Sequence, residues 1–299
     1  RLSQKEGLTK TGQYVFRNAL TSDMLVKQLV ATAMEKRGYK KFAILYPNDK
    51  YGIEYANLFW DEVLRRGGEI TGAQPYTSKE TDFSGPIRRL VGTFYVEDRI
   101  SEYRLHLKEW KKKQKRLSER NTPPTDLLPP IVDFDALFIP DGVKALGQIA
   151  PTLPYHDISN LPLMGTNLWN NSQLISRGQS LVEKSIFVDG LVTQNTNFKK
   201  TQFFNEYKKT FGLEPGMLEA QAYDIGLMLR QLINSGVNSR VELAQALSHI
   251  KTFNGSLGQL AVDESGEFTR PIYSLTVLNG KILSEDIAEM ERQNATTTQ

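Results

Sequence analysis

The sequence predicts an α/β protein in which helices flank parallel strands, and three observations support this fold class. Short runs of branched and aromatic residues, which suit buried strands, alternate with amphipathic runs of helical length. Turn-forming residues separate many of these runs. Strands that alternate with helices in this way form βαβ units and a parallel sheet. A chain of 299 residues is long for one compact core and accommodates two α/β lobes.

The clearest strand–helix unit lies early in the chain. A strand is expected over 40–47 and a helix over 51–66, which a glycine pair at 67–68 ends. Asp61 and Arg65 are one helical turn apart and can pair on the outer face. The expected inner face carries Tyr55, Leu58, Phe59 and Val63.

Further strands and helices follow the same rhythm. An N-cap signal at 21–23 precedes a helix with Leu25, Leu29, Val30 and Ala33 on one face. Strands are expected over 69–76, 135–140 and 161–165, with helices after the first two. After Gln194 the pattern becomes helical, over 198–211, 217–236 and 239–250, and then hairpin-like over 253–282. The end, 292–299, is expected to fray.

A segment over 96–132 interrupts the rhythm and is interpreted as an insertion. Its first part, 99–120, is a strongly basic helical stretch in which Tyr103, Leu107 and Trp110 share one face. That face suits docking on the chain's own protein, with solvated lysines outside. A contact with another protein or an anionic surface, and a nucleic-acid contact, are the alternatives.

Several function classes lack support in the sequence. A net charge of +3 is too small to indicate nucleic acid, and without cysteine a thiolate metal site or a disulfide framework is impossible. The histidines (His106, His156 and His249) are scattered without metal-ligand spacing. No phosphate-binding glycine motif or nucleophile arrangement occurs, and no stretch approaches the roughly 18 apolar residues of a membrane span. We therefore expect neither an enzyme nor a cofactor.

A series of motifs resembles a known family. The run 14–70 is followed in order by "TDFSGPIRRL", "DALFIPDG", "LMGTNLW", "YKKTFGLEP", "AQAYDIGLML", "FNGSLGQLAVDESGEFTRP" and "VLNGKI". This order is similar to type I periplasmic (extracellular) ligand-binding proteins, in particular the branched-chain amino acid receptors. The stretches 139–157 and 187–191 also resemble the branch of penicillin-binding-protein activators. The resemblance covers nearly the whole chain except the insertion and the tail.

The resemblance implies a fold of two α/β lobes joined by three crossing strands. It predicts a hinge entry strand over 1–16 and lobe 2 over 17–191, with the insertion 96–132 inside it. The C-terminal part of lobe 1 then follows over 192–265, a return to lobe 2 over 266–283, and a tail over 284–299. Crossings are expected near 14–19, 187–194 and 263–275.

Proteins of this family usually begin with about a hundred residues of lobe 1 before the first motif seen here, so lobe 2 is expected complete and lobe 1 partial. The family also implies a periplasmic or extracytoplasmic location, with a lipid anchor possible through a missing N-terminus. The implied partners are an amino-acid-like small molecule and a membrane transporter or a cell-wall enzyme, with dimer formation possible and no nucleic acid.

Ligands of open α/β sheets bind beyond the carboxyl ends of strands, which points to three turns. Tyr51 begins the helix after the first strand, and the family implies that it packs against the ligand; capping of the core is the alternative. Asp141 follows the strand 135–140 and could hold an ammonium group or cap a helix. Asn167 and Trp169 follow 161–165. Asn167 stands where the family often has an acid, and Trp169 is either a stacking wall or a buried structural residue.

Two functions remain open from the sequence. The first is an extracytoplasmic solute-binding protein that closes on a small ligand, an amino acid or related polar molecule, for an ABC transporter. The second is a non-transport interaction module of the same fold, acting as a cell-wall-enzyme activator or regulatory receptor. The basic insertion favours the second. Asp224, within the helix 217–236, is expected to have a structural role.

Overall fold

The computed structural model describes residues 7–114, 127–192 and 196–297, which form two compact units. The sheet unit comprises Val30–Phe187 and Val277–Lys281. The helical unit comprises Arg1–Leu29, Val188–Thr276 and Ile282–Gln299. The lobe boundaries expected from the family resemblance stay predictions.

The sheet unit alternates strands with helices, as the sequence predicts. Helix α1 (Ser22–Ala31) leads into it through a π-helical turn, Thr32–Lys36. Its elements are then β1 (Lys41–Pro47), α2 (Lys50–Arg65), β2 (Glu69–Tyr76), α3 (Ser84–Leu90), η3 (Val96–Arg99), α4 (Ile100–Gln114), β3 (Ala136–Phe138), α5 (Val143–Tyr155), β4 (Leu163–Met164), η4 (Asn167–Trp169), α6 (Gln173–Gly178), η5 (Gln179–Val182) and β5 (Ile186–Asp189).

The helical unit starts with a short helix, η1 (Thr9–Thr11), and is mostly helical after β5. Its elements are α7 (Thr196–Lys199), α8 (Gln202–Phe211), α9 (Met217–Asn234), α10 (Arg240–Ser248), β6 (Phe253–Gly255), β7 (Gly258–Val262) and β8 (Phe268–Thr269). Strands β6, β7 and β8 form an antiparallel three-stranded sheet, which confirms the hairpin pattern predicted for this part of the chain. The chain ends with β9 (Tyr273–Leu278), β10 (Lys281–Ser284) and α11 (Glu285–Thr297).

A seven-stranded sheet of order β10-β9-β5-β4-β3-β1-β2 confirms the α/β fold class. Strand β1 pairs in parallel with β2 and β3, and β3–β4 and β4–β5 are parallel as well. Because parallel strands point the same way, the carboxyl ends of β1 to β4 lie along one edge. Each of these ends leads into a turn or helix, so the side chains that follow them are brought together.

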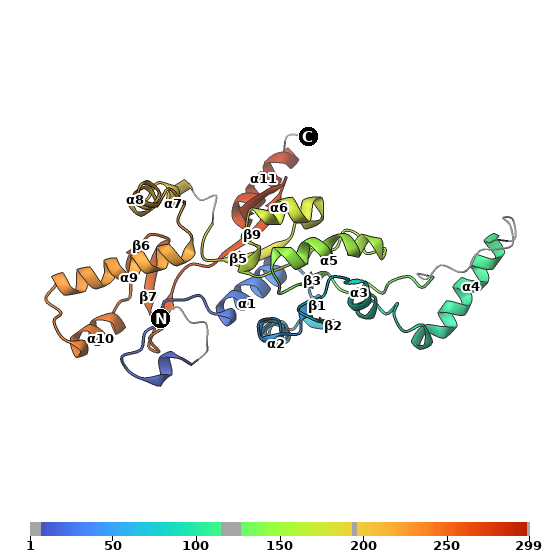
Figure 1. The fold of residues 1–299 in the computed structure, drawn as a ribbon, viewed down its shortest axis with the longest axis horizontal. Coiled ribbons are helices and arrows are strands. Elements are labelled where there is room, and N and C mark those ends of the chain that lie inside the picture. Colours follow the sequence, from blue (N-terminus) through green and yellow to red (C-terminus); the bar gives the residue numbers. More distant parts are fainter. Residues whose placement is uncertain (1–6, 115–126, 193–195, 298–299) are drawn as a thin grey trace. The chain divides into compact units, whose positions relative to one another are not determined.

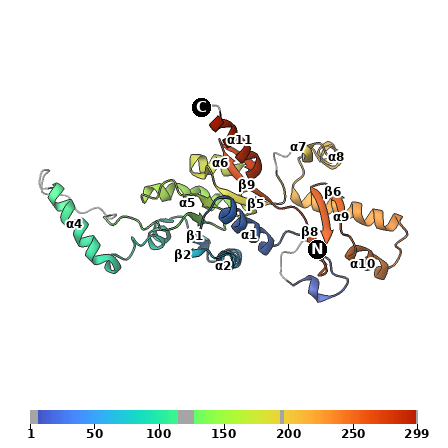
Figure 2. The same cartoon turned by 180° about the vertical axis from the view of Figure 1, so that it is seen from behind.

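Helices cover both faces of these strands. Helix α2 lies on one side of the sheet and α5 on the other (Figure 1), and the view from behind shows the same layers (Figure 2). The strand residues 42–45 of β1 are fully buried. Phe59 of α2 packs edge-on to Phe42 at 5.5 Å and stacks on Phe138 of β3 at 4.2 Å. Aromatic packing of this kind accounts for the predicted apolar face of the helix.

The charged side of α2 contains a pair that the sequence did not predict. Arg65 pairs with Glu62 at 2.6 Å, and the expected Asp61–Arg65 pair stays a prediction. Glu62 is only 5% exposed and also accepts from Arg66 at 2.6 Å. Hydrogen bonds from Arg65, the largest cause, and then from Arg66 lower the pKa of the Glu62 carboxyl, although burial opposes them. A buried carboxylate needs a partner more than an exposed one does, which favours this pairing.

The basic stretch forms α4, and an arginine fixes its base. Arg99 donates to the carbonyl oxygens of Gly92 at 3.0 Å and Pro129 at 2.8 Å, and it pairs with Glu102 at 2.6 Å. Helix α11 continues to Thr297, and fraying of the end of the chain stays a prediction. Acidic residues in its first turn, Glu285 and Asp286, favour the helix through its dipole.

Two segments expected to cross between lobes lie side by side in the helical unit. Arg17 and Glu267 form a parallel bridge, and their side chains form a partly buried ion pair of 2.6 Å. Asp224 of α9 is fully buried and accepts from the backbone N–H of Ser256 at 2.6 Å, as a structural residue would. Burial, the largest cause, raises the pKa of the Asp224 carboxyl.

The start of α2 approaches the end of β1 so closely that only glycine fits at residue 52. A Cβ on Gly52 would lie 2.6 Å from Cγ of Pro47 and 2.7 Å from Cδ. Asp49 caps the helix by accepting from the Gly52 N–H at 2.8 Å. The glycine therefore allows α2, which carries Tyr51 in its first turn, to start directly against the end of β1.

We predict that Gly52→Ala lowers the free energy of unfolding by about 1–3 kcal/mol, because the added methyl group overpacks this contact. Urea unfolding followed by circular dichroism measures it. The control is Gly226→Ala in α9, where a Cβ meets no atom within 4 Å. There alanine should be neutral or stabilise by roughly 0.5–1 kcal/mol. Equal stability of Gly52→Ala and the wild type would contradict the steric argument.

Candidate functional site

The turns after β1, β3 and β4 carry the residues that the sequence singled out. We call the polar side chains gathered here the carboxyl-edge cluster: Tyr51, Tyr76, Asp141, Thr166 and Asn167. All belong to the sheet unit. Tyr76 is the last residue of β2, and the others follow β1, β3 and β4. Their order along the edge follows the strand order of the sheet.

Tyr51 lies in the first turn of α2, half-buried at the edge of the sheet. Its hydroxyl shares a hydrogen bond of 2.8 Å with the hydroxyl of Thr166, which follows β4. Its ring packs on Tyr55 with 4.5 Å between ring centres. Burial, the largest cause, raises the pKa of the Tyr51 hydroxyl, and Tyr55 adds to this. The hydroxyl therefore stays protonated at neutral pH and can donate.

Asp141 and Tyr76 form a second pair. The Tyr76 hydroxyl donates to Oδ2 of Asp141 at 2.7 Å, and the Gly142 N–H donates to Oδ1 at 2.6 Å. Tyr76 is 4% exposed, whereas Asp141 is partly exposed. Burial and then the hydrogen bond to Asp141 raise the pKa of Tyr76. The Asp141 carboxylate thus combines neutral donors with access to solvent.

Trp169 has a different place from the other predicted site residues. Its ring is fully buried, and its indole N–H donates to the carbonyl oxygen of Asp141 at 2.8 Å. The ring lies against Gly165, where a Cβ would come within 2.5 Å of its Cε3 atom. This is the buried structural tryptophan that the sequence left as an alternative. In this arrangement it offers no open face to a ligand and instead holds Asp141.

Asn167 is partly exposed at the start of η4. Its side-chain amide has no hydrogen-bond partner among the residues that the structure describes. An amide offers two donors and an acceptor, so it can pair with either a carboxylate or an ammonium group. Of the predicted residues, Tyr51, Asp141 and Asn167 thus lie at the edge as available or partly available polar groups.

Sequence reasoning missed Tyr76 and Thr166. Tyr76 was counted only as the end of a strand, although its position at the carboxyl end was a usable signal. Thr166 lies between Gly165 and Asn167 and is 1% exposed. It also accepts from the Leu168 N–H at 3.4 Å, so its hydroxyl both caps η4 and orients Tyr51. Only the arrangement of the parallel strands identifies Thr166 as the partner of Tyr51 and Tyr76 as the partner of Asp141.

The cluster has the chemistry of recognition more than of catalysis. It contains hydroxyls, an amide and a carboxylate, with no histidine, lysine or activated nucleophile among them. Over the residues that the structure describes, no group of three or more acidic or histidine side chains could hold a metal ion. Helices α2 and α5 also begin at this edge, after β1 and β3, so the positive ends of their dipoles lie there.

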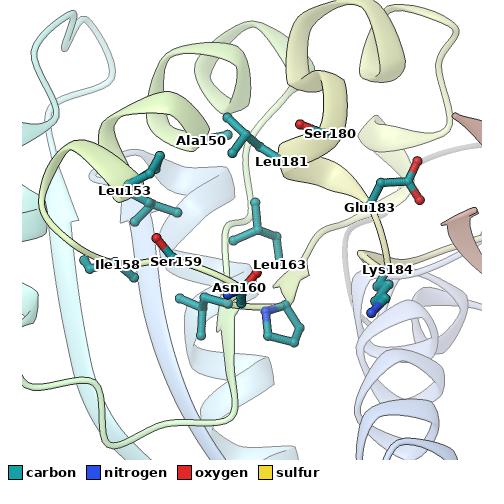
Figure 3. A pocket seen from close by; sticks show the side chains of 13 residues that line it. Ala150, Leu153, Ile158, Ser159, Asn160, Leu163, Ser180, Leu181, Glu183 and Lys184 are labelled. Carbon is teal, nitrogen blue, oxygen red and sulfur yellow. The ribbon is translucent and has the colours of Figure 1, made fainter. Parts of the chain in front are cut away.

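A separate hollow of about 440 Å³ lies at the other end of β4 (Figure 3). Leu153, Leu163 and Leu181 contribute apolar walls, and Glu183 lies at its rim. The Glu183 carboxylate accepts from the backbone N–H groups of Asn279 at 3.1 Å and Gly280 at 2.7 Å. That charge is thus used to hold a turn, while Ser159, Asn160 and Lys184 also line the hollow.

The sequence matches no family model and no curated protein, but solved structures share its architecture. A leucine-binding protein, LivK, from Thermotoga maritima has a TM-score of 0.62 at 19% identity, over 93% of this chain and 68% of that chain. A protein described as a branched-chain amino acid ABC transporter from Rhodospirillum rubrum has a TM-score of 0.70 at 18% identity, over 94% and 70%. The chain has the type I periplasmic-binding-protein fold.

A third structure with the type I periplasmic-binding-protein fold is LivJ from Streptococcus pneumoniae in complex with isoleucine. Its TM-score is 0.60 at 21% identity, over 94% of this chain and 70% of that chain. LivK is described as a leucine-binding protein, and LivJ as the substrate-binding protein of a branched-chain amino acid transporter. At sequence identities of 18–21%, the similarity shows a shared fold.

Within the described part of the chain, none of the helices has the length and apolar character needed to cross a bilayer.

The buried tyrosines make the stability of the protein sensitive to alkaline pH. Folding raises the pKa of Tyr51 and Tyr76, so the native state keeps protons that the unfolded chain releases near pH ~10. Their contribution is complete below that pH and is lost as the pH rises above it. We predict that a Tyr51→Phe, Tyr76→Phe double variant loses stability less steeply above pH ~10.

The difference in slope should approach about 1.4 kcal/mol per pH unit for each tyrosine, measured by urea unfolding at a series of pH values. Tyr95→Phe is the control, since Tyr95 is 54% exposed. It should retain the wild-type slope. Identical slopes for the double variant and the wild type would show that the two hydroxyls are not held in their protonated form by the fold.

Proposed function

We propose that the chain is an extracytoplasmic solute-binding protein that holds an amino-acid-like ligand at the carboxyl-edge cluster. The observation that carries this proposal is the convergence of Tyr51, Asp141 and Asn167 at one edge of the parallel sheet. Open α/β sheets bind small molecules in this position because loops and helix N-termini meet there. The hinge closure that the family resemblance implies stays a prediction.

The Asp141 carboxylate is suited to bind a ligand that carries an ammonium group. Both of its oxygens accept from neutral donors, Tyr76 and the Gly142 N–H, and within the described residues it forms no ion pair. A partly buried carboxylate without a cation gains from a bound one. This carboxylate can therefore take the role that an acid at the position of Asn167 has in many family members.

Tyr51 and Asn167 complete the proposed contacts. The half-buried Tyr51 ring presents a flat apolar wall that loses little rotamer entropy on binding. The Asn167 amide can donate to a ligand carboxylate near the helix N-termini, which favour negative charge. Trp169 acts through Asp141, which it holds by its indole hydrogen bond.

The solved structures of the same fold support the ligand class. Their names describe proteins that bind leucine or isoleucine, and one is described as part of a branched-chain amino acid ABC transporter. We accordingly propose a membrane ABC transporter as the partner and a small polar solute as the cargo. The alternative of a cell-wall-enzyme activator and a dimeric state stay predictions.

A thermal-shift screen against amino acids, small peptides and cell-wall fragments tests the proposal. A ligand at a hundred times its dissociation constant stabilises the protein by roughly 2.7 kcal/mol, which gives a clear shift. We predict a shift with ligands that carry an ammonium group and none with their N-acetylated forms, which lack that charge. No shift with any of them in a folded sample would contradict the proposal.

Asp141→Asn should weaken the binding of a ligand found in this way by about ten- to a hundredfold, since it removes the charge that pairs with the ammonium. Isothermal titration measures the affinity. The asparagine can still accept from Tyr76, so the melting temperature without ligand should change little. Asp61→Asn, on the exposed face of α2, is the matched control and should bind as the wild type does. Unchanged affinity in Asp141→Asn would remove Asp141 from the site.

A further inference from the structure

Helix α4 carries a narrow apolar stripe. Ile100, Tyr103, Leu107 and Trp110 are spaced by three, four and three residues, which is the spacing of the inner positions of a coiled coil. Ile100 is 40% exposed, and the other three keep part of their surface in solvent. With 15 residues the helix is about 22 Å long, enough to pair with another helix over several turns.

Different charges flank the stripe on its two sides. Arg104, Lys108 and Lys111 follow one another at helical spacing along one side. On the other side His106 lies 3.8 Å from both Glu102 and Glu109. Glu102 is already paired with Arg99. The acids therefore have partners along the helix itself, whereas the three cations form no ion pair with any residue that the structure describes.

The base of the helix is held in place before any partner arrives. The guanidinium of Arg99 bonds to Gly92, Pro129 and Glu102, and the Ile131 N–H donates to the Val91 carbonyl at 2.9 Å. The segment that leads into α4, residues 91–99, is thus joined to the later segment 129–131. A helix fixed in this way loses less entropy on binding than a free segment would.

We propose that α4 is a docking helix for an acidic amphipathic helix of a partner protein. The stripe would form the apolar seam, and acidic residues of the partner would face Arg104, Lys108 and Lys111. Side chains that flank a coiled-coil seam select the partner through their charges. The inference is independent of the solute site.

A second copy of α4 fits this surface less well. In an antiparallel pair Arg104 and Lys111 would face the same cations of the other copy. In a parallel pair they would face the side on which His106, and no acid, lies next to the seam. A membrane surface also fits less well, because one row of apolar residues is a seam and not a broad face, and because Glu102 and Glu109 lie on the same helix, beyond His106.

The test uses the full chain and two fluorescent synthetic helical peptides with leucine at the seam positions. One has glutamate at the flanking positions, and the other has lysine there. We expect fluorescence anisotropy to show binding of the glutamate peptide only, with an affinity that falls as salt is added. Equal binding of the two peptides, or no binding of the glutamate peptide, would overturn the proposal.

Variants locate the binding surface. Lys111→Glu and Arg104→Glu should each weaken binding by about tenfold, because an attraction becomes a repulsion. Lys112→Glu, one residue further and away from the seam, is the matched control and should change affinity by less than about twofold. An equal effect of Lys111→Glu and Lys112→Glu would show general charge attraction and would overturn the proposal.

Leu107→Asp tests the apolar seam and should abolish binding of the glutamate peptide. If Leu107→Asp lowers the melting temperature, the binding of the glutamate peptide is instead measured with Leu107→Ala and Lys111→Glu, which should both weaken it. Two further outcomes would also overturn the proposal. One is self-association of the chain that Leu107→Asp disrupts, and the other is binding to anionic phosphatidylglycerol vesicles without binding to the peptide.

Discussion

Hydrogen bonds between the carboxyl ends of different strands of one sheet determine the geometry of the candidate site. The Tyr51 hydroxyl reaches Thr166 after β4, the Tyr76 hydroxyl reaches Asp141 after β3, and the Trp169 indole reaches the Asp141 carbonyl oxygen. A buried polar group without a partner costs more than the bond itself contributes. These bonds therefore hold four turns in one arrangement, and the groups left over face the edge of the sheet.

The electrostatics of this edge follow from the same bonds. Asp49 accepts from the Gly52 N–H and the Ser78 hydroxyl, and Asp141 accepts from Tyr76 and the Gly142 N–H. All of these donors are neutral, so neither negative charge is compensated by a cation among the described residues. Glu62 shows the opposite solution, because two arginines surround it away from the edge. The charge of Glu62, which two arginines neutralise, stabilises the fold, whereas the charge of Asp141 is available to a ligand.

Much of the fold could be predicted from local patterns. The strand–helix alternation over 40–76 appears nearly as expected, because the apolar periods of 2 and 3.6 report directly on burial. The Glu62–Arg65 pair within α2 could not be predicted, since Asp61 and Glu62 both lie within reach of Arg65 along a helix. Burial of Glu62 by the surrounding structure favours this pair. The extent of α11 was also not predicted, because the end of a helix depends on charges and packing as well as on composition.

The candidate site divides in the same way. The sequence by itself determined the fold class and placed Tyr51, Asp141 and Asn167 after strands, since turns and helix starts have local signals. Only the tertiary structure joined Tyr51 to Thr166 and Tyr76 to Asp141, residues that lie 115 and 65 positions apart. It also decided that Trp169 is buried, because Gly165 leaves space for its ring. Contacts of this range depend on strand order and close packing, which no local pattern contains.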